Sequence, residues 1–485
     1  MKRQLVLIHG YSASGLDFTP LRTALQGQGI DAVDINVGNY VSLNNEITIK
    51  DIAEGLDRAF RSNPKFNADQ PFDAIVHSTG MLVIRSWLTN YGAEVNSNNR
   101  LKRLKHLIGV APATWGSPQA SKGRTWLGAL VKGDKQVGPD FLNAGDQVLD
   151  GLELGSRFTW ELAEADLLGP APYYSKGPDT PYVCVFIGNT PYDGLSSVAN
   201  DPGTDGTVRW SGCALNTRKI VVDLTRTPIG ADGKPIDRIS ITPWEDDRLN
   251  IPMIPVEGRN HATLISNPDP AMVKLIADFL KVGDDGEETQ DAWFARAEEF
   301  GKNAKAKMLV NPGKDAGGVT GELKTFFGHL AGGEEMEGWQ QFAIHARDER
   351  GDGVRDYLID VLTKQGDQWV AFEEMYTDVH AYKSDPSYRC FHIRLPKGIS
   401  TGTVPLMLRV HASSGTELMV YQGYGSNETQ TNMTADAAPV EIDLSALADA
   451  GASLFHPFTT TMVEIILNRE PYPLNGVSRL FGFLS

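Results

Sequence analysis

Apolar, strand-like segments alternate with longer helical patterns through the first 282 residues of this 485-residue chain. The expected strands are Gln4–Ile8, Ala32–Ile35, Phe72–Val76, Leu104–Val110, Tyr182–Ile187, Lys219–Leu224 and Ile251–Val256. Helical patterns separate several of them, at Thr19–Gln28, Thr48–Ser62, Gly80–Tyr91 and Ala271–Val282. Short, continuously apolar strands joined through helices favour a mainly parallel sheet with both faces covered. We therefore expect an α/β domain over residues 1–282.

A different pattern follows this alternation. The acidic, glycine-bearing segment Gly283–Thr289 breaks it, and we expect residues 283–320 to be a linker that includes a helix at Trp293–Met308. Beyond it, turns bound strand-like runs at Arg355–Leu362, Trp369–Tyr376, Arg389–Leu395, Val404–His411, Glu417–Tyr424, Val440–Leu444 and Met462–Leu467. Their spacing predicts an antiparallel β-sandwich or barrel, so residues 321–485 should form an all-β, sandwich-like C-terminal domain.

Composition narrows the substrate class. The formal charge of −16 repels nucleic acid and anionic headgroups at long range, so a neutral substrate is expected and nucleic acid is not. The three cysteines lack a metal-binding spacing and require no disulfide framework. Phosphate-loop, dinucleotide and paired metal-ligand motifs are absent from the sequence, and we expect neither a cofactor nor a metal.

The most informative stretch is His77-Ser78-Thr79-Gly80, which follows an expected strand and precedes an apolar helical pattern. A serine on so sharp a strand-to-helix turn projects its hydroxyl out of the sheet. The next N–H, that of Thr79, then lies at a helix start, where negative charge is stabilised. The alternative interpretation is an ordinary strand–helix junction with a capping serine.

This stretch resembles the nucleophile elbow of α/β-hydrolases, and its lipase branch in particular. One departure is Val76, which stands where the G-x-S-x-G pattern has its first glycine. The resemblance covers about residues 4–282. It implies an α/β-hydrolase fold whose serine, acid and histidine occur in that order along the chain, each at the carboxyl end of a strand.

By this resemblance, Ser78 is the nucleophile, Asp205 the acid and His261 the base. Thr204-Asp205-Gly206-Thr207-Val208 is similar to the lipase acid loop, although Asp193 and Asp201 remain rivals. His261 lies in a glycine-bearing loop between the last expected strand and helix. The backbone N–H groups of Tyr11 and Thr79 would form the oxyanion hole, with the preceding His9 in a structural role.

An insertion over about residues 112–178 carries many aromatic residues outside the strand pattern. One interpretation is a helical cap that only packs on the domain. The other is an acyl-binding pocket or lid over Ser78, as in lipases, with substrate contacts from Trp115, Trp126 and Leu130. The cap would then also make interfacial contact with lipid.

The expected function is hydrolysis of carboxylic esters, as in a lipase or esterase of lipid metabolism, through a Ser-His-Asp triad and an acyl-enzyme. A phospholipase or an acyltransferase would use the same triad. A different class remains open: a catalytically lapsed hydrolase that binds a partner through its β-domain. The same domain could also make an oligomer contact.

Two further expectations concern ions and location. The acidic clusters Asp348–Asp352 and Glu373–Glu374 lack calcium-ligand spacing, so solvated turns are expected there. We see no signal peptide and no run of about 20 apolar residues, which a spanning helix would need. Location in the cytoplasm, leaderless secretion and secretion with a removed leader all fit this observation.

Overall fold

The structure is a computed structural model. It describes residues 4–8, 18–35, 46–67, 69–89, 97–121, 145–169, 173–174, 179–192, 200–226, 232–233, 237–242, 251–283, 288–309, 336–372, 376–399, 405–416, 419–422, 440–444 and 454–471. The chain divides into two compact units. The first unit contains Met1–Thr217, Trp244–Gly338 and Phe458–Thr460, and the second contains Arg218–Pro243, Trp339–Pro457 and Thr461–Ser485.

A parallel sheet of six strands forms the centre of the first unit, in the order β2-β1-β3-β4-β5-β8. These strands are β1 (Gln4–Ile8), β2 (Ala32–Ile35), β3 (Phe72–His77), β4 (Leu104–Val110), β5 (Tyr182–Gly188) and β8 (Met253–Val256). Every residue of β3 and of β5 is buried, as expected for strands that are covered on both faces. The expected parallel sheet is confirmed.

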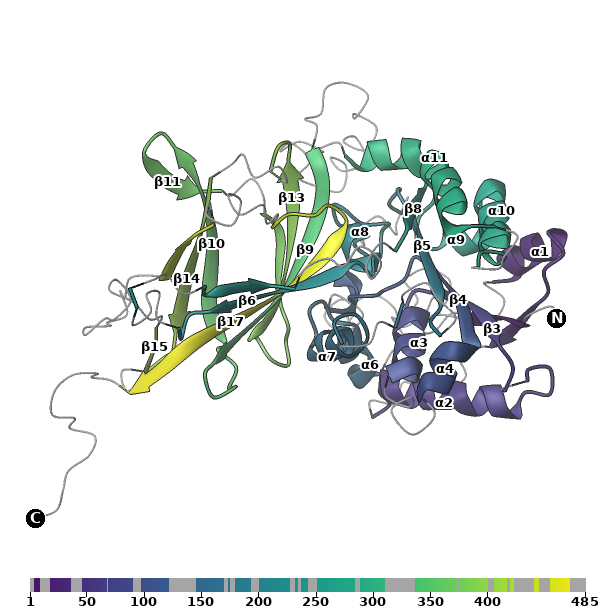
Figure 1. The fold of residues 1–485 in the computed structure, drawn as a ribbon, viewed down its shortest axis with the longest axis horizontal. Coiled ribbons are helices and arrows are strands. Elements are labelled where there is room, and N and C mark those ends of the chain that lie inside the picture. Colours follow the sequence, from purple (N-terminus) through teal and green to yellow (C-terminus); the bar gives the residue numbers. More distant parts are fainter. Residues whose placement is uncertain are drawn as a thin grey trace, which may run out of the picture. The chain divides into compact units, whose positions relative to one another are not determined.

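Helices cover both faces of this sheet (Figure 1). One layer comprises α1 (Thr19–Gly27), α9 (Thr263–Ser266), α10 (Pro270–Phe279) and α11 (Gln290–Met308). The other comprises α2 (Ile49–Ser62), α3 (Gly80–Thr89), α4 (Ser97–Arg103), α6 (Asp146–Leu152) and α7 (Arg157–Asp166). The short helix α8 (Trp210–Cys213) packs on β5.

Local sequence signals account for where several helices begin. Thr48 and Asp51 form a reciprocal capping box at the start of α2. Asp269 caps α10, and Pro270 then occupies the first helical position, where its missing N–H costs nothing. Inside α3 every residue is buried, because this helix packs against β3 and against the helices α2, α4 and α7.

The second unit is a β-sandwich, as expected. One sheet has the order β11-β10-β14-β16, and the other has the order β12-β13-β9-β17-β6-β7, with β15 paired to β17. The strands are β6 (Thr217–Asp223), β7 (Ile239–Ile241), β9 (Met336–Asp348), β10 (Asp356–Gln365), β11 (Gln368–Ala371), β12 (Tyr376–Ala381), β13 (Tyr388–Pro396), β14 (Leu406–Ser413), β15 (Met419–Gln422), β16 (Val440–Asp443) and β17 (Thr459–Pro471). Side chains from both sheets share one apolar core, which includes Val222, Ile359 and Ile465.

Three features differ from the sequence-based expectations. The strand expected at Lys219–Leu224 forms as β6, but it belongs to the sandwich and not to the parallel sheet. Helix α11, assigned to the linker, packs on β8 and α10 within the first unit. Strands β7, β9 and β12 were not among the expected strands. In β9 the buried polar pair Gln340 and Gln341 interrupts the apolar pattern.

Cys184, Cys213 and Cys390 are all buried. None of the helices in the described ranges combines the length and the apolar character needed to cross a membrane.

Candidate active site

Ser78 occupies the turn between β3 and α3. Its φ of 54° lies in the left-handed region, which a residue with a side chain rarely adopts. Three backbone hydrogen bonds hold this conformation: Ser78 N–H donates to Val110 O (3.3 Å), while the N–H groups of Met81 (3.2 Å) and Ala113 (3.0 Å) donate to Ser78 O. Such a strained serine turn is characteristic of a nucleophile elbow.

The acid candidate Asp205 lies in the segment that follows β5. Its Oδ1 accepts hydrogen bonds from the backbone N–H groups of Thr207 (3.0 Å) and Val208 (2.8 Å). Tyr192 braces the same segment, because its hydroxyl lies 2.9 Å from Thr207 Oγ1. The neighbouring Gly206 has a φ of 96°, and a Cβ there would lie 2.5 Å from the Tyr192 ring. The carboxylate is therefore buried in a fixed orientation.

The base candidate His261 lies in the loop between β8 and α9. Its Nδ1 is 3.1 Å from Oδ2 of Asp205, and its backbone N–H donates to Asp205 O at 3.0 Å. A carboxylate only accepts hydrogen bonds, so Nδ1 carries the proton. Of the acid candidates, Asp205 is bonded to His261, and Asp193 lies outside the described residues.

Several buried polar atoms at this place have no hydrogen bond, and the Oγ of Ser78 and the Nε2 of His261 are among them. The two atoms therefore do not hydrogen-bond to each other in this structure. Since His77, the residue before Ser78, has its ring centroid 4.7 Å from that of His261, the structure brings the nucleophile turn and the base loop together. A buried imidazole with its proton on Nδ1 and a vacant lone pair on Nε2 has the form of a general base.

Of the two residues predicted to form the oxyanion hole, the structure describes Thr79 only. Thr79 follows Ser78 at the start of α3, and its side-chain hydroxyl is buried without a partner. Tyr11 and His9 lie outside the described residues, so the second donor stays a prediction.

Of the substrate-contact predictions, Trp115 is described, whereas Trp126 and Leu130 lie outside the described residues. Trp115 is fully buried. Its backbone N–H donates to Gly212 O at 3.0 Å, whereas its indole Nε1 has no hydrogen-bond partner. Gly116 follows with a φ of 84°, and a Cβ there would lie 2.4 Å from Leu152 O. This turn, which begins the insertion, therefore packs against both α8 and α6.

The same turn supports the acid segment. Ser117 Oγ donates to Thr207 O at 2.5 Å, and Thr114 Oγ1 donates to Cys213 O at 2.7 Å. Burial raises the pKa of the Cys213 thiol well above its usual value, and the charge of Asp205 adds to this effect. This effect favours the neutral thiol, which is a weaker nucleophile than the thiolate.

A buried ion pair joins α3 to the insertion, and the sequence analysis missed it. Arg85 donates to both carboxylate oxygens of Asp166 at 2.7 and 2.8 Å, and to Thr114 O at 2.9 Å. Tyr174 donates to the same carboxylate at 2.6 Å. Burial alone would lower the pKa of Arg85, but Asp166 outweighs it and raises that pKa. An arginine within an apolar helix was the available signal for a buried partner.

In the part of the chain that the structure describes, no three His, Cys, Asp or Glu residues cluster in a way that could hold a metal ion. Asp348, in one acidic cluster, accepts hydrogen bonds from the N–H groups of Arg350 and Asp352 and lies 3.4 Å from Arg469. Glu373 and Glu374 lie outside the described residues.

Neither a family model nor a curated protein matches this sequence. Solved structures do match. The phospholipase PlaB from Legionella pneumophila in complex with thio-NAD is 21% identical, with a TM-score of 0.69 over 100% of this chain and 98% of that chain. A second structure of PlaB is 20% identical, with a TM-score of 0.70 over 100% of this chain and 97% of that chain. This chain has the α/β-hydrolase fold. The likeness extends through the C-terminal β-region, and the expected fold class is confirmed for both parts of the chain.

Proposed function

We propose that this protein is a serine hydrolase that cleaves carboxylic esters of lipids with Ser78, His261 and Asp205. One observation carries the proposal: a buried histidine is bonded to a buried aspartate and keeps a vacant Nε2 beside a strained serine turn. The lipid-hydrolysing neighbours with the same fold support it.

The first half of the reaction forms an acyl-enzyme. Ser78 Oγ attacks the ester carbonyl carbon while His261 Nε2 accepts the hydroxyl proton. Negative charge develops on the carbonyl oxygen, where the Thr79 N–H and a second donor from the loop after β1 would stabilise it. The carbon–oxygen bond then breaks, and the alcohol leaves with the proton from His261.

The second half releases the acid. Water gives a proton to His261 Nε2 and attacks the acyl carbon, after which Ser78 leaves and recovers its proton. Asp205 keeps the proton of His261 on Nδ1 and stabilises the imidazolium without taking the proton itself. The carboxylate is suited to this role because two backbone N–H groups already fix its other oxygen.

The direct test is hydrolysis of nitrophenyl esters from acetate to palmitate by the full chain and by Ser78→Ala. We expect turnover by the natural sequence and a loss of about 10⁶-fold in kcat for the variant. Equal rates for the two proteins would contradict the proposal.

A phospholipid is the second candidate substrate, because the similarity to a phospholipase includes the whole chain and not only the catalytic domain. Vesicles of phosphatidylcholine, with fatty-acid release as the readout, test it. Added alcohol separates hydrolysis from acyl transfer, since an acyltransferase would form a new ester. Absence of turnover in every assay would favour a lapsed hydrolase that acts as a binding module.

The cap proposal has its own test. Truncating Trp126 and Leu130 to alanine should change the chain-length profile if the insertion lines the acyl site. An unchanged profile would leave the insertion with a packing role only.

A further inference from the structure

His77 is a buried histidine that the triad does not use. It is the last residue of β3 and directly precedes Ser78, and its side chain has no solvent exposure. Its Nε2 lies 3.1 Å from the backbone carbonyl oxygen of His261, and the two rings are 4.7 Å apart between centroids at 46°. The ring of Phe18 makes a T-shaped contact with that of His77, with the ring centroids 6.0 Å apart.

The chemistry of this contact decides where a proton lies. A backbone carbonyl can only accept a hydrogen bond, so Nε2 of His77 must carry a proton and donate it. The bond is buried, where an unmade hydrogen bond costs more than at the surface. His77 therefore holds the backbone of residue 261 at a fixed distance from the nucleophile turn.

The anchors of His261 can be enumerated atom by atom. Its N–H donates to Asp205 O, its Nδ1 donates to Asp205 Oδ2, and its carbonyl accepts from His77. Only Nε2 remains without a partner. Two anchors thus come from the acid segment, while the third comes from the strand that carries the nucleophile.

We infer that His77 is a positioning residue, which sets the place of the His261 imidazole relative to Ser78 through the carbonyl of residue 261. The inference rests on the proposed function. It explains why a histidine stands in the elbow: the residue one position before the nucleophile is the one that can reach the base loop. A displacement of about 1 Å in such a constellation costs about 10²-fold in rate.

Two variants separate the donor from the ring. His77→Gln keeps an N–H donor at the position of Nε2 and loses the ring, whereas His77→Phe keeps a ring of similar shape and loses the donor. We expect His77→Gln to retain kcat within about threefold and His77→Phe to lose about 30-fold, with KM unchanged in both, since a misplaced base affects the chemical step and not substrate binding.

A spectroscopic readout tests the positioning directly. The Nδ1 proton of His261, bonded to Asp205, should give a low-field proton resonance in the full chain, assigned by its loss in Asp205→Asn. We expect this resonance to persist in His77→Gln and to shift or broaden in His77→Phe. Should the phenylalanine variant not fold, His77→Met has no donor either and carries the same expectation.

The inference is overturned if the donor-free variant matches the natural sequence in kcat and keeps the resonance unchanged, or if His77→Gln loses as much activity as His77→Phe. Failure of the proposed function would look different, because the natural sequence itself would then show no turnover that depends on Ser78.

Discussion

Two buried histidine–aspartate pairs lie in the first unit, at opposite ends of the parallel sheet. His106 Nδ1 is 2.7 Å from Asp73 Oδ1, and these residues stand near the starts of β4 and β3. His261 and Asp205 lie in loops that follow the ends of β8 and β5. The two pairs therefore join the same two residue types and differ in their place in the fold.

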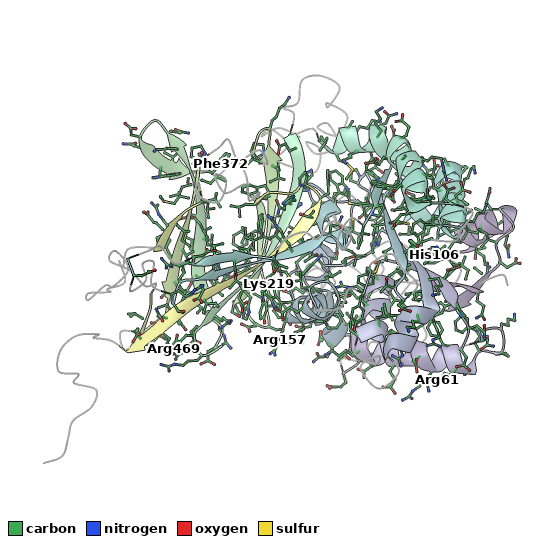
Figure 2. The ribbon with its side chains drawn as sticks, in the orientation of Figure 1. Arg61, His106, Arg157, Lys219, Phe372 and Arg469 are labelled. Carbon is green, nitrogen blue, oxygen red and sulfur yellow. The ribbon has the colours of Figure 1, made fainter. Side chains whose placement is uncertain are left out.

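The pairs also differ in whether Nε2 of the histidine has a hydrogen-bond partner. His106 donates from Nε2 to Val282 O at 2.8 Å, and its ring stacks on Tyr182 and meets the edge of Phe279. Figure 2 shows His106 within the first unit, among the strands of its sheet. His261 keeps Nε2 vacant. A buried histidine–aspartate pair alone therefore does not indicate a catalytic site. What matters is a vacant nitrogen at the carboxyl end of the strands, where sites in α/β folds form.

Replacing each of the two histidines with alanine should give the largest difference in kcat. His261→Ala should lower kcat by about 10⁶-fold, because the serine then lacks its base. His106→Ala should keep kcat within about tenfold of the natural value under conditions where it is folded, since the hydrogen bonds and ring contacts that it removes are remote from the chemistry. Ester hydrolysis at saturating substrate measures both. Comparable losses from the two substitutions would abolish the distinction.

Replacing each of the two aspartates with asparagine should give a smaller difference in kcat than replacing the histidines. Asp205→Asn presents a side chain that can reverse the tautomer of His261, and we expect a loss of about 10⁴-fold in kcat. Asp73→Asn is the matched control, with nearly unchanged kcat. If Asp205→Asn were as active as its control, the assignment of the acid would be wrong.

Loss of stability should be larger in His106→Ala than in His261→Ala, the reverse of their order in kcat. His106→Ala leaves the buried Asp73 without its ring partner, so we expect it to lower the free energy of unfolding by about 3 kcal/mol. The loss in His261→Ala should be about 1 kcal/mol, because Asp205 keeps two backbone N–H donors. Urea unfolding of the two variants measures the difference, and equal losses would contradict the structural role of His106.

The smallest expected effect concerns a charged group in the second unit. Burial works to raise the pKa of Glu464, but hydrogen bonds from Lys219 and Arg347 outweigh it and lower that pKa. Lys219, which Figure 2 labels on β6, lies 2.8 Å from the carboxylate. The ionised Glu464 therefore contributes stability above its unfolded pKa of about 4.3, and this contribution is lost as the pH falls through the lowered pKa of the folded state.

Unfolding of the second unit at pH 7, 5 and 4, compared with Glu464→Gln, measures this contribution. The variant should show a weaker loss of stability towards acid. An identical pH dependence in the two proteins would exclude Glu464 as a contributor.

Local patterns predicted the parallel sheet because its strands are short, apolar and separated by helices. They could not show that β6 joins the sandwich, since a strand such as Lys219–Leu224 looks the same whichever sheet it enters. Helix α11 carried a readable signal: Trp293, Ala297, Gly301 and Ala304 are buried at helical spacing. Its acidic flank at Gly283–Thr289 led to its assignment as a linker.

The candidate site residues could be proposed from the sequence for the same reason. Ser78, Asp205 and His261 each follow a strand end, and sequence can place a strand end. The contacts that hold them are tertiary: His77 with the carbonyl of residue 261, and Ser117 with the carbonyl of Thr207. No spacing along the chain encodes a side chain that meets a distant backbone oxygen, so these residues became visible only in the fold.

Labelling with a fluorophosphonate, followed by mass spectrometry of the modified peptide, tests the central claim most directly. We predict one adduct, on Ser78, which forms with the natural sequence and with His106→Ala and is lost in His261→Ala. An adduct on another serine, or labelling that does not depend on His261, would contradict the proposed catalytic centre.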